Sequence, residues 1–183
     1  FYYPEKHGGL VKDWLGARTP LHAQKGADLG QRMHEAFCRT AAEGFDRMLL
    51  MGSDIPEINA PVLCRAVESL KVNPAVIGPA KDGGYYLIGF QNKAVVPEVF
   101  SRIDWGTASV LEATLERFAQ CRMAPDIVPA LNDIDTRGDL QDLAGRLASR
   151  AGGGPGLGHT RAMLARMGFL QKPQSMSACM DAR

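Results

Sequence analysis

The sequence contains no run of 18 or more apolar residues, which a membrane-spanning helix needs. Its N-terminus also lacks a basic segment followed by an apolar one, so we expect no secretory signal peptide. The chain has 183 residues, of which 45% are hydrophobic and 22% charged, and this composition predicts one globular α/β domain rather than two.

An excess of one charge and a framework of cysteines are also absent. The 21 basic and 20 acidic residues give a net charge of +1, which creates no long-range field to attract a polyanion, so nucleic acid is not the expected partner. The four cysteines lie far apart and form no C-x-x-C pair: Cys38, Cys64, Cys121 and Cys179. This spacing predicts free thiols in a reducing compartment, not a disulfide framework or a zinc site, and the cytoplasm is the simplest such compartment.

The two ends of the chain differ in composition from the centre. Phe1 to Pro4 is aromatic, has β character and carries no initiator methionine, so we expect the end of a strand whose beginning is absent. Residues 151–158, AGGGPGLG, predict a flexible linker. The predicted domain therefore spans residues 1–150, and residues 159–183 predict a short helix followed by a tail.

Helical and strand patterns alternate between these ends. They predict helix, strand, helix, strand, strand, helix and helix, at residues 29–44, 48–51, 61–70, 75–77, 85–90, 109–120 and from 137. Capping boxes mark three helix starts: Asp28 with Gln31, Ser109 with Glu112, and Thr136 with Asp139. This order favours a three-layer α/β fold whose sheet has mixed strand direction near one edge. The unbroken apolar run at residues 48–51 predicts a strand inside that sheet, covered on both faces.

The segment MLLMGSDIPEI, which begins at Met48, places a carboxylate at the tip of a predicted strand. Ligands of open α/β sheets bind beyond the carboxyl ends of the strands, so Asp54 stands where a ligand is expected. The alternative is that Asp54, which precedes Ile-Pro, forms a turn or caps a helix. Both interpretations remain open from the sequence alone.

The segment GADLGQRM, residues 26–33, begins a predicted helix. The free N–H groups and the dipole at a helix start can hold a phosphate or a base edge, and Arg32 adds positive charge. The alternative is that Asp28 already caps this helix and competes with an anion.

The segment GPAKDGGYYLIG, residues 78–89, also has two interpretations. Gly83 and Gly84 would let a substrate approach the backbone closely, while Lys81 and Asp82 supply polar contacts. Alternatively, Asp-Gly-Gly is a plain hairpin turn, because Asp-Gly favours positive φ.

The segment NDIDTRGDL, residues 132–140, carries a third group of carboxylates. Asp133 and Asp135 point to opposite faces if the segment is extended, so one of them can face Asp54. The alternative is that the segment only caps the next helix through Thr136 and Asp139.

Five segments together resemble a known family: GADLGQRMHEAF, LLMGSDIPEI, VIGPAKDGGYYLIGF, IDWGTASVL and LNDIDTRGDL. In order and spacing they are similar to the rSAM/selenodomain-associated transferase 1 family of bacterial proteins, from about Trp14 to Leu143. That family resembles the nucleotide-diphospho-sugar transferase superfamily, which includes molybdenum-cofactor and phospholactate guanylyltransferases. The resemblance implies a three-layer, Rossmann-like glycosyltransferase-A fold with a mostly parallel mixed sheet, lacking its N-terminal strand in this sequence.

The resemblance also implies roles for single residues. Asp54 and Asp135 would hold Mg²⁺ or Mn²⁺ bound to the nucleotide diphosphate, and Asp54 and Asp82 would be catalytic. The residues that would border the nucleotide are Gly26, Asp28, Leu29, Gly30, Arg32 and Ser53. Those on the sugar or acceptor side are Lys81, Asp82, Gly83, Gly84, Tyr85, Trp105 and Thr107. For Trp105, an indole that fills the core is the alternative.

The expected function is thus a metal-dependent glycosyl- or nucleotidyltransferase that acts on a nucleotide diphosphate-sugar or a nucleoside triphosphate, with an unknown acceptor. One feature of the family does not occur here: its loop K-x-P-x-P-G-x-V-K-T-R-L, which Lys12 does not replace. The alternative is a non-catalytic relative that binds a nucleotide or a partner and lacks this loop. A gene that encodes the loop upstream of Phe1 would favour the transferase.

Overall fold

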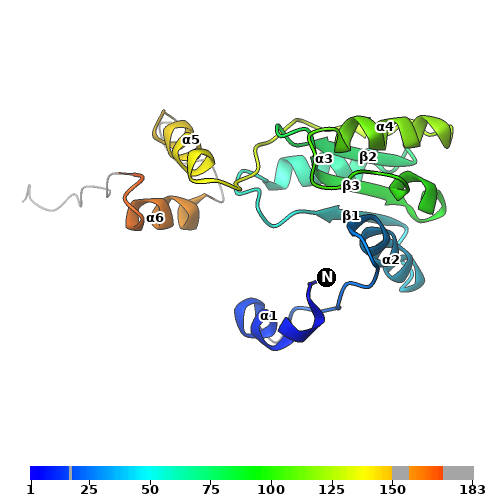
Figure 1. Ribbon diagram of the computed structural model, residues 1–183, viewed down its shortest axis with the longest axis horizontal. Coiled ribbons are helices and arrows are strands. Elements are labelled where there is room, and N and C mark those ends of the chain that lie inside the picture. The colour runs from blue at the N-terminus through cyan, green and yellow to red at the C-terminus, as the bar shows by residue number, and fades with distance from the viewer. Residues whose placement is uncertain (17, 150–156, 171–183) are drawn as a thin grey trace, which may run out of the picture. The chain divides into compact units, whose positions relative to one another are not determined.

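In the computed structural model, four strands form one mixed sheet in the order β1-β3-β2-β4 (Figure 1). The strands are β1 (Arg47–Met51), β2 (Ala75–Pro79), β3 (Tyr85–Gln91) and β4 (Asp126–Ile127). β3 is antiparallel to β1 and β2, and β4 pairs with β2 in parallel. Three strands therefore run in one direction and β3 runs against them. The structure describes residues 1–16, 18–149 and 157–170.

The helices follow the predicted order. The α-helices are α1 (Gly8–Leu15), α2 (Leu29–Ala42), α3 (Ala60–Ser69), α4 (Val110–Gln120), α5 (Arg137–Ser149) and α6 (Gly158–Arg166); the short 3-10 helices are η1 (Glu5–His7), η2 (Asn92–Ala94) and η3 (Pro97–Phe100). The sequence does not predict α1, since two glycines open it. α4 begins beside Ser109 as predicted, but Ser109 makes no capping bond, and its hydroxyl lies 2.9 Å from that of Thr107.

Helices cover both faces of the sheet, which confirms the predicted three-layer α/β class. One face packs on α3 and the loop before it, through Ile55, Ala66, Leu70, Val76, Leu87 and Val128. The other face packs on α2, η3 and α4, through Met33, Phe37, Met48, Ile77, Ile88, Phe90, Phe100 and Phe118. Burial of these apolar side chains on both sides is the main force that holds the layers together.

β1 lies at an edge of the sheet formed by the described residues, whereas the sequence predicts an interior strand. The apolar run is nevertheless covered on both faces, because Met48 belongs to the core under α2 and Leu49 packs against the core under α3. The predicted interior position of β1 is therefore wrong. The neighbours of a strand are fixed by long-range pairing, which the residues of that one strand do not encode.

The antiparallel strand is β3, the second strand from the β1 edge of the sheet, which agrees with the predicted mixed direction near one edge. α3 connects β1 to β2 as a crossover, which makes these two strands parallel. The short loop of residues 80–84 joins β2 to β3, and such a loop permits only an antiparallel pair. β3 then fills the position between β1 and β2.

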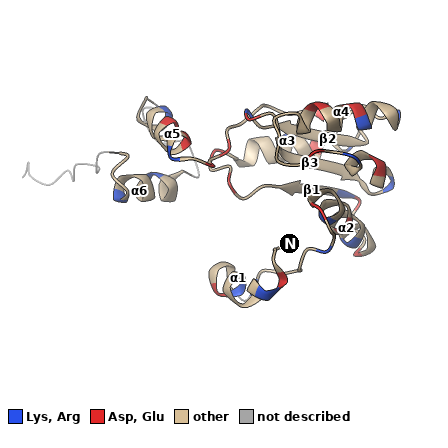
Figure 2. Cartoon of the chain, in the orientation of Figure 1, with Lys and Arg blue, Asp and Glu red and all other residues tan. Residues whose placement is uncertain are grey.

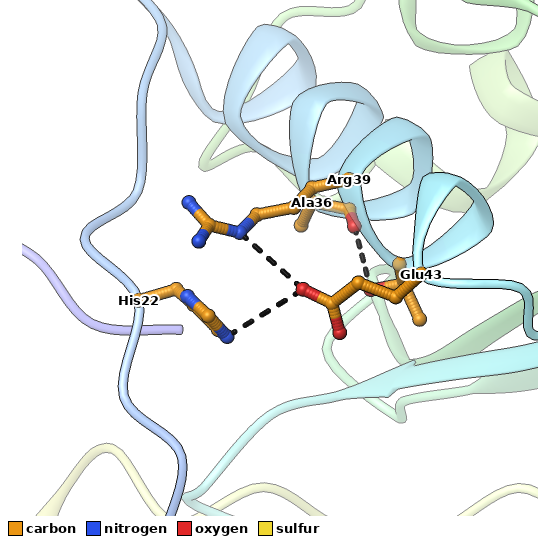
Figure 3. A network of polar contacts seen from close by, with 5 residues as sticks. His22, Ala36, Arg39 and Glu43 are labelled. Atoms are coloured by element: carbon orange, nitrogen blue, oxygen red, sulfur yellow. Dashed lines mark hydrogen bonds and ion pairs between the residues drawn. The ribbon is translucent and has the colours of Figure 1, made fainter.

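The segment before α2 is tied to that helix by polar contacts (Figure 3). His22 Nε2 and Arg39 Nε lie 3.9 Å and 3.6 Å from the same carboxylate oxygen of Glu43. Two backbone hydrogen bonds join this segment to the start of the chain, from Tyr2 N–H to the His22 carbonyl and from Gln24 N–H to the Tyr2 carbonyl. The contacts of His22 and Arg39 with Glu43 are exposed ion pairs, which contribute little stability.

The chain divides into two compact units, residues 1–132 and 133–183. In the second unit, α5 and α6 pack through Leu143, Ala144, Leu147, Leu157 and Leu164. The predicted domain limit at residue 150 stays a prediction. Residues 151–156 of the predicted linker and 171–183 of the predicted tail lie outside the described residues, and Gly158 already begins α6.

Charged residues of both signs are mixed along the helices (Figure 2), as the net charge of +1 implies. Among the described residues, no helix combines the length and apolar character that crossing a membrane requires.

Candidate functional site

The segment after β1 leaves two polar residues exposed. The N–H of Gly52 donates to the Tyr86 carbonyl at 3.0 Å and extends the pairing of β1 with β3, while Ile55 is buried in the core under α3. Ser53 and Asp54, between these two anchors, are exposed. Within the described residues the Asp54 carboxylate makes no hydrogen bond or ion pair, and it folds back over Gly52, where an added Cβ would lie 2.5 Å from Asp54 Oδ1.

Asp54 does not cap the helix that follows. The cap of α3 is Asn59, whose Oδ1 accepts a hydrogen bond from the Val62 N–H at 3.1 Å. The turn before α3 is closed by the N–H of Ile58 and the carbonyl of Ile55, at 3.2 Å. Other residues therefore cap α3 and close the turn before it. The role of Asp54 as a ligand-binding carboxylate stays a prediction.

Asp82, Gly83 and Gly84, which we call the glycine turn, lie in the hairpin loop between β2 and β3. Asp82 Oδ1 accepts a hydrogen bond from the Gly84 N–H at 2.8 Å, and Gly83 has φ +95°, which favours glycine. On the other side, the Lys81 N–H donates to the Leu131 carbonyl at 3.2 Å. The backbone of this segment therefore forms a hairpin turn, and the exposed Asp82 side chain stabilises the turn through its hydrogen bond with the Gly84 N–H.

The glycine turn and Asp54 both lie at the end of the sheet where β1 and β2 finish, which we call the carboxyl edge. β1 and β2 are both antiparallel to β3, so their carboxyl ends both meet its first residues (Figure 1). Gly52, after β1, bonds to Tyr86, and Pro79, at the end of β2, pairs with Tyr85. Open sheets bind ligands at this edge, so the unit brings an unpaired carboxylate and a glycine turn to the expected place.

α2 also starts at this edge. Near its end, the Ala41 carbonyl accepts a hydrogen bond from Asn92 Nδ2 at 3.5 Å, just after β3 ends. Near its start, Met33 Sδ accepts a hydrogen bond from the Tyr85 hydroxyl at 3.9 Å, where β3 begins. α2 therefore runs in the direction of β3, and its N-terminal turn lies beside the carboxyl ends of β1 and β2.

The polar groups at the start of α2 are engaged with the chain itself. Asp28 accepts hydrogen bonds from the backbone N–H of Gln31 at 2.8 Å and from its side-chain amide at 3.1 Å, which confirms the predicted cap. Arg32 Nε donates to the Gly26 carbonyl at 3.2 Å, and its guanidinium lies 4.1 Å from the centre of the Tyr3 ring. The predicted place of these residues, and of the exposed Leu29, beside a nucleotide stays a prediction.

Trp105 and Thr107 lie in the loop of residues 104–109, which we call the WGT loop. The Trp105 indole is partly buried against the core under α2 and meets the Tyr85 ring edge-on, with centroids 6.5 Å apart. It also lies on Gly30, where an added Cβ would be 2.8 Å from the indole. The Thr107 hydroxyl donates to the Asp104 carbonyl at 2.8 Å. The core interpretation of Trp105 therefore has direct structural support.

Asp135 belongs to the second unit, just before α5. Asp139 accepts hydrogen bonds from the Asp135 N–H at 3.1 Å and from the N–H and hydroxyl of Thr136 at 2.7 Å and 2.8 Å, so the predicted cap is confirmed. The Asp135 carboxylate itself is exposed. The meeting of Asp54 with Asp135 on one metal ion stays a prediction.

Sequence reasoning missed two residues that shape this edge. Gly52 makes room for the Asp54 carboxylate, and its position directly before Ser-Asp is the signal for it. Glu57 is only 8% exposed, and its Oε2 accepts a hydrogen bond from Asn132 Nδ2 at 3.4 Å. A glutamate between Pro and Ile in an apolar stretch indicates such a buried carboxylate, because burying a charge requires polar partners.

Comparisons with known proteins agree with this architecture. Residues 1–107 match a family described as "Uncharacterized protein conserved in bacteria (DUF2064)". The chain is also similar to the crystal structure of a "putative nucleotide-diphospho-sugar transferase" from Desulfovibrio desulfuricans G20, with 34% identity and a TM-score of 0.79 over 92% of this chain and 72% of that one. No curated protein matches the chain. These findings support the predicted superfamily and its glycosyltransferase-A-like fold; the narrower rSAM-associated family stays a prediction.

Proposed function

The chain belongs to the DUF2064 family of uncharacterized bacterial proteins, and on this premise we propose that it is a transferase whose donor is a nucleotide diphosphate-sugar or a nucleoside triphosphate. The group transferred would be a glycosyl or a nucleotidyl group, and the reaction would depend on Mg²⁺ or Mn²⁺. The similar protein from Desulfovibrio desulfuricans G20 supports the class of reaction through its description.

One observation supports this proposal most directly: the carboxylate of Asp54 is exposed and unpaired among the described residues, at the carboxyl end of β1. A carboxylate with no structural partner is available to a ligand. The same edge of the sheet carries the glycine turn and the N-terminal turn of α2. A diphosphate needs a cation and close approach to backbone, and this edge offers candidates for both.

The metal ion would be held by Asp54 and Asp135. Both carboxylates are exposed, and carboxylate oxygens are the ligands that Mg²⁺ prefers. When bound, such an ion neutralises the charge that develops on a diphosphate leaving group. Ser53 and the first turn of α2 would border the nucleotide. Asp82, in the glycine turn, and Lys81, which precedes the turn, would orient the sugar or the acceptor hydroxyl.

A second candidate is a relative that binds a nucleotide or a protein partner without catalysis. The start of α2 favours it, because Asp28 already fills the helix cap and Arg32 is bonded to the Gly26 carbonyl. An aspartate at a helix start weakens the attraction for phosphate. The two candidates differ in one requirement: only the transferase needs the divalent ion at Asp54.

A thermal-shift screen tests the proposal. The wild type is heated with nucleoside triphosphates, nucleoside diphosphates and nucleotide sugars, each with and without Mg²⁺ or Mn²⁺. A ligand present at 100 times its Kd adds about 2.7 kcal/mol to the free energy of unfolding, which is a readily measured shift. Binding that requires the divalent ion supports the transferase, and metal-independent binding supports the second candidate.

The variant Asp54→Asn should keep its melting temperature without ligand, since the carboxylate has no partner to lose, and should lose the metal-dependent shift. Asp46→Asn is the matched control, because Asp46 is also exposed and lies before β1, at the opposite end of the same strand. If Asp54→Asn unfolds the protein, Asp54 is a structural residue. If the variant binds nucleotide with metal as the wild type does, the Asp54 carboxylate is not needed for metal binding. Either result contradicts the proposal.

A further inference from the structure

The WGT loop touches two parts of the proposed site. Its indole packs on the first turn of α2, and its carboxyl-terminal end packs on the glycine turn. We propose that Trp105 is a positioning residue that holds these two parts at a fixed separation. The identity of the ligands in this inference rests on the proposed function, whereas the mechanical role of Trp105 rests on the contacts alone.

The contact with α2 requires a glycine. Gly30 is buried, and a Cβ added there would lie 2.8 Å from the Trp105 ring and 2.5 Å from the Phe100 carbonyl oxygen. Cβ atoms essentially never come within 3.0 Å of another group, so any other residue would displace the ring or the backbone. The indole therefore rests on the backbone of α2, at its second residue, and not on a side chain that could yield.

The contact with β3 depends on a bulge. Gly78 pairs with Leu87, but its neighbour Pro79 pairs with Tyr85, so Tyr86 is an extra residue in β3. Tyr85 is thereby turned to the face covered by α2, where its ring meets the Trp105 indole edge-on. Without the bulge, the alternation of the strand would place Tyr85 on the α3 face, beside Leu87.

The contact with the glycine turn is made by the backbone. The Leu111 N–H, in the first turn of α4, donates to the Gly83 carbonyl at 2.9 Å. Gly83 itself fits tightly, since an added Cβ would lie 2.0 Å from the Ala108 carbonyl oxygen. The Thr107 hydroxyl closes the loop between these contacts by its bond to the Asp104 carbonyl. A movement of Trp105 is thus transmitted to the glycine turn over a few residues.

This arrangement has a consequence for a reaction between two bound groups. The rate of such a reaction depends on how well the groups are aligned, and a displacement of about 1 Å can cost roughly 100-fold. In the proposed function the nucleotide lies at the start of α2 and the sugar or acceptor at the glycine turn. Trp105 would affect the reaction rate by fixing the distance between these two binding places. A ligand bound at one place should also reduce the mobility of the other.

Hydrogen–deuterium exchange of the full chain without ligand tests the mechanical role. Trp105→Ala should speed amide exchange about tenfold in two segments, residues 28–33 and 80–86, and leave α3 unchanged. Trp105→Phe keeps part of the ring and should give a smaller increase in the same segments, which is informative even if the alanine variant folds poorly. Trp14→Ala is the control, since Trp14 is 75% exposed on α1. Unchanged exchange in either segment, or an equal increase in α3, would overturn the role.

The same measurement with Mg²⁺ and each of UDP, GDP, ADP and CDP tests the coupling. In the wild type, a bound nucleoside diphosphate should slow exchange in both segments. In Trp105→Ala it should slow exchange in residues 28–33 only, and slowing in both segments would overturn the coupling. If none of the four nucleotides slows exchange in the wild type, the proposed function loses support, while the ligand-free comparison still decides whether Trp105 positions the two segments.

Discussion

The Tyr86 hydroxyl donates a hydrogen bond to the carbonyl oxygen of Pro129 at 2.8 Å and so ties β3 to the segment that follows β4. Tyr86→Phe would leave this carbonyl without its donor, and we expect the free energy of unfolding to fall by about 1 to 2 kcal/mol. Urea unfolding measures the change. Tyr3→Phe is the control, because Tyr3 is 59% exposed and should lose less than about 0.5 kcal/mol. Equal losses in the two variants would contradict this account.

Alkaline pH should weaken the fold through the tyrosines of β3. Burial raises the pKa of Tyr85 and of Tyr86 above the ordinary value of 10.0, and for Tyr85 a hydrogen bond from Thr114 partly opposes the rise. Above pH 10 the unfolded chain therefore binds fewer protons than the folded one, so stability is full below this pH and falls as the pH rises.

The variant Tyr85→Phe isolates the contribution of Tyr85, because it lacks this one tyrosine of raised pKa and shares all other titratable groups with the wild type. We expect the urea midpoint of Tyr85→Phe to decline less than that of the wild type between about pH 9 and pH 11. Parallel declines would mean that Tyr85 does not contribute to the pH dependence.

Alanine substitutions at two glycines of positive φ allow the cost of backbone strain to be measured apart from the cost of a steric clash. Gly106, with φ +86°, has open space around an added Cβ, so Gly106→Ala should cost about 1 kcal/mol from the backbone alone. Gly83, with φ +95°, faces the Ala108 carbonyl, so Gly83→Ala should cost about 3 kcal/mol or more. The difference between the two urea-unfolding energies measures the contact of the glycine turn with the WGT loop. A difference near zero would show that the turn moves freely away from this loop.

Acid should loosen α5 through its cap. The hydroxyl and N–H of Thr136, followed by weaker contributions that include the Asp135 N–H, lower the pKa of Asp139 below its ordinary value of 3.8. A lowered pKa means that the stabilisation is present above the unfolded value and is lost as the pH falls through the folded value.

Exchange protection of residues 137–149 should accordingly fall as the pH is lowered through this range in the wild type, and Asp139→Asn should show weaker protection with less pH dependence. Asp142→Asn is the control, because Asp142 lies in the same helix and is exposed. If both variants follow the wild type, the bonds to Asp139 do not stabilise the start of α5.

Local signals account for most of what the sequence predicts correctly. α2 was expected because Asp28 and Gln31 form a capping box, and both partners are engaged in the structure. The apolar run of β1 correctly indicates cover on both faces, as Met48 and Leu49 show. Information of this kind lies within a few residues of the chain, where capping bonds and side-chain alternation are decided.

Other features depend on contacts between distant segments, which no local pattern contains. The edge position of β1 follows from pairing over long separations. β4 has only two residues and is a strand because β2 pairs with it. For the candidate site, Asp54 and the glycine turn stay predictions from the sequence, and the support of Trp105 on Gly30 is visible only in three dimensions.

The central place of the β2–β3 hairpin bears on the order in which the sheet assembles. These two strands are joined by residues 80–84, so their pairing closes a short loop, whereas β1 and β4 must reach the hairpin across α3 and α4. Loop closure costs more entropy as the loop lengthens, and distant pairings form more slowly. We therefore expect the hairpin to form first during folding, so the glycine turn, which we propose to lie beside a substrate, would also influence how fast the protein reaches its native state.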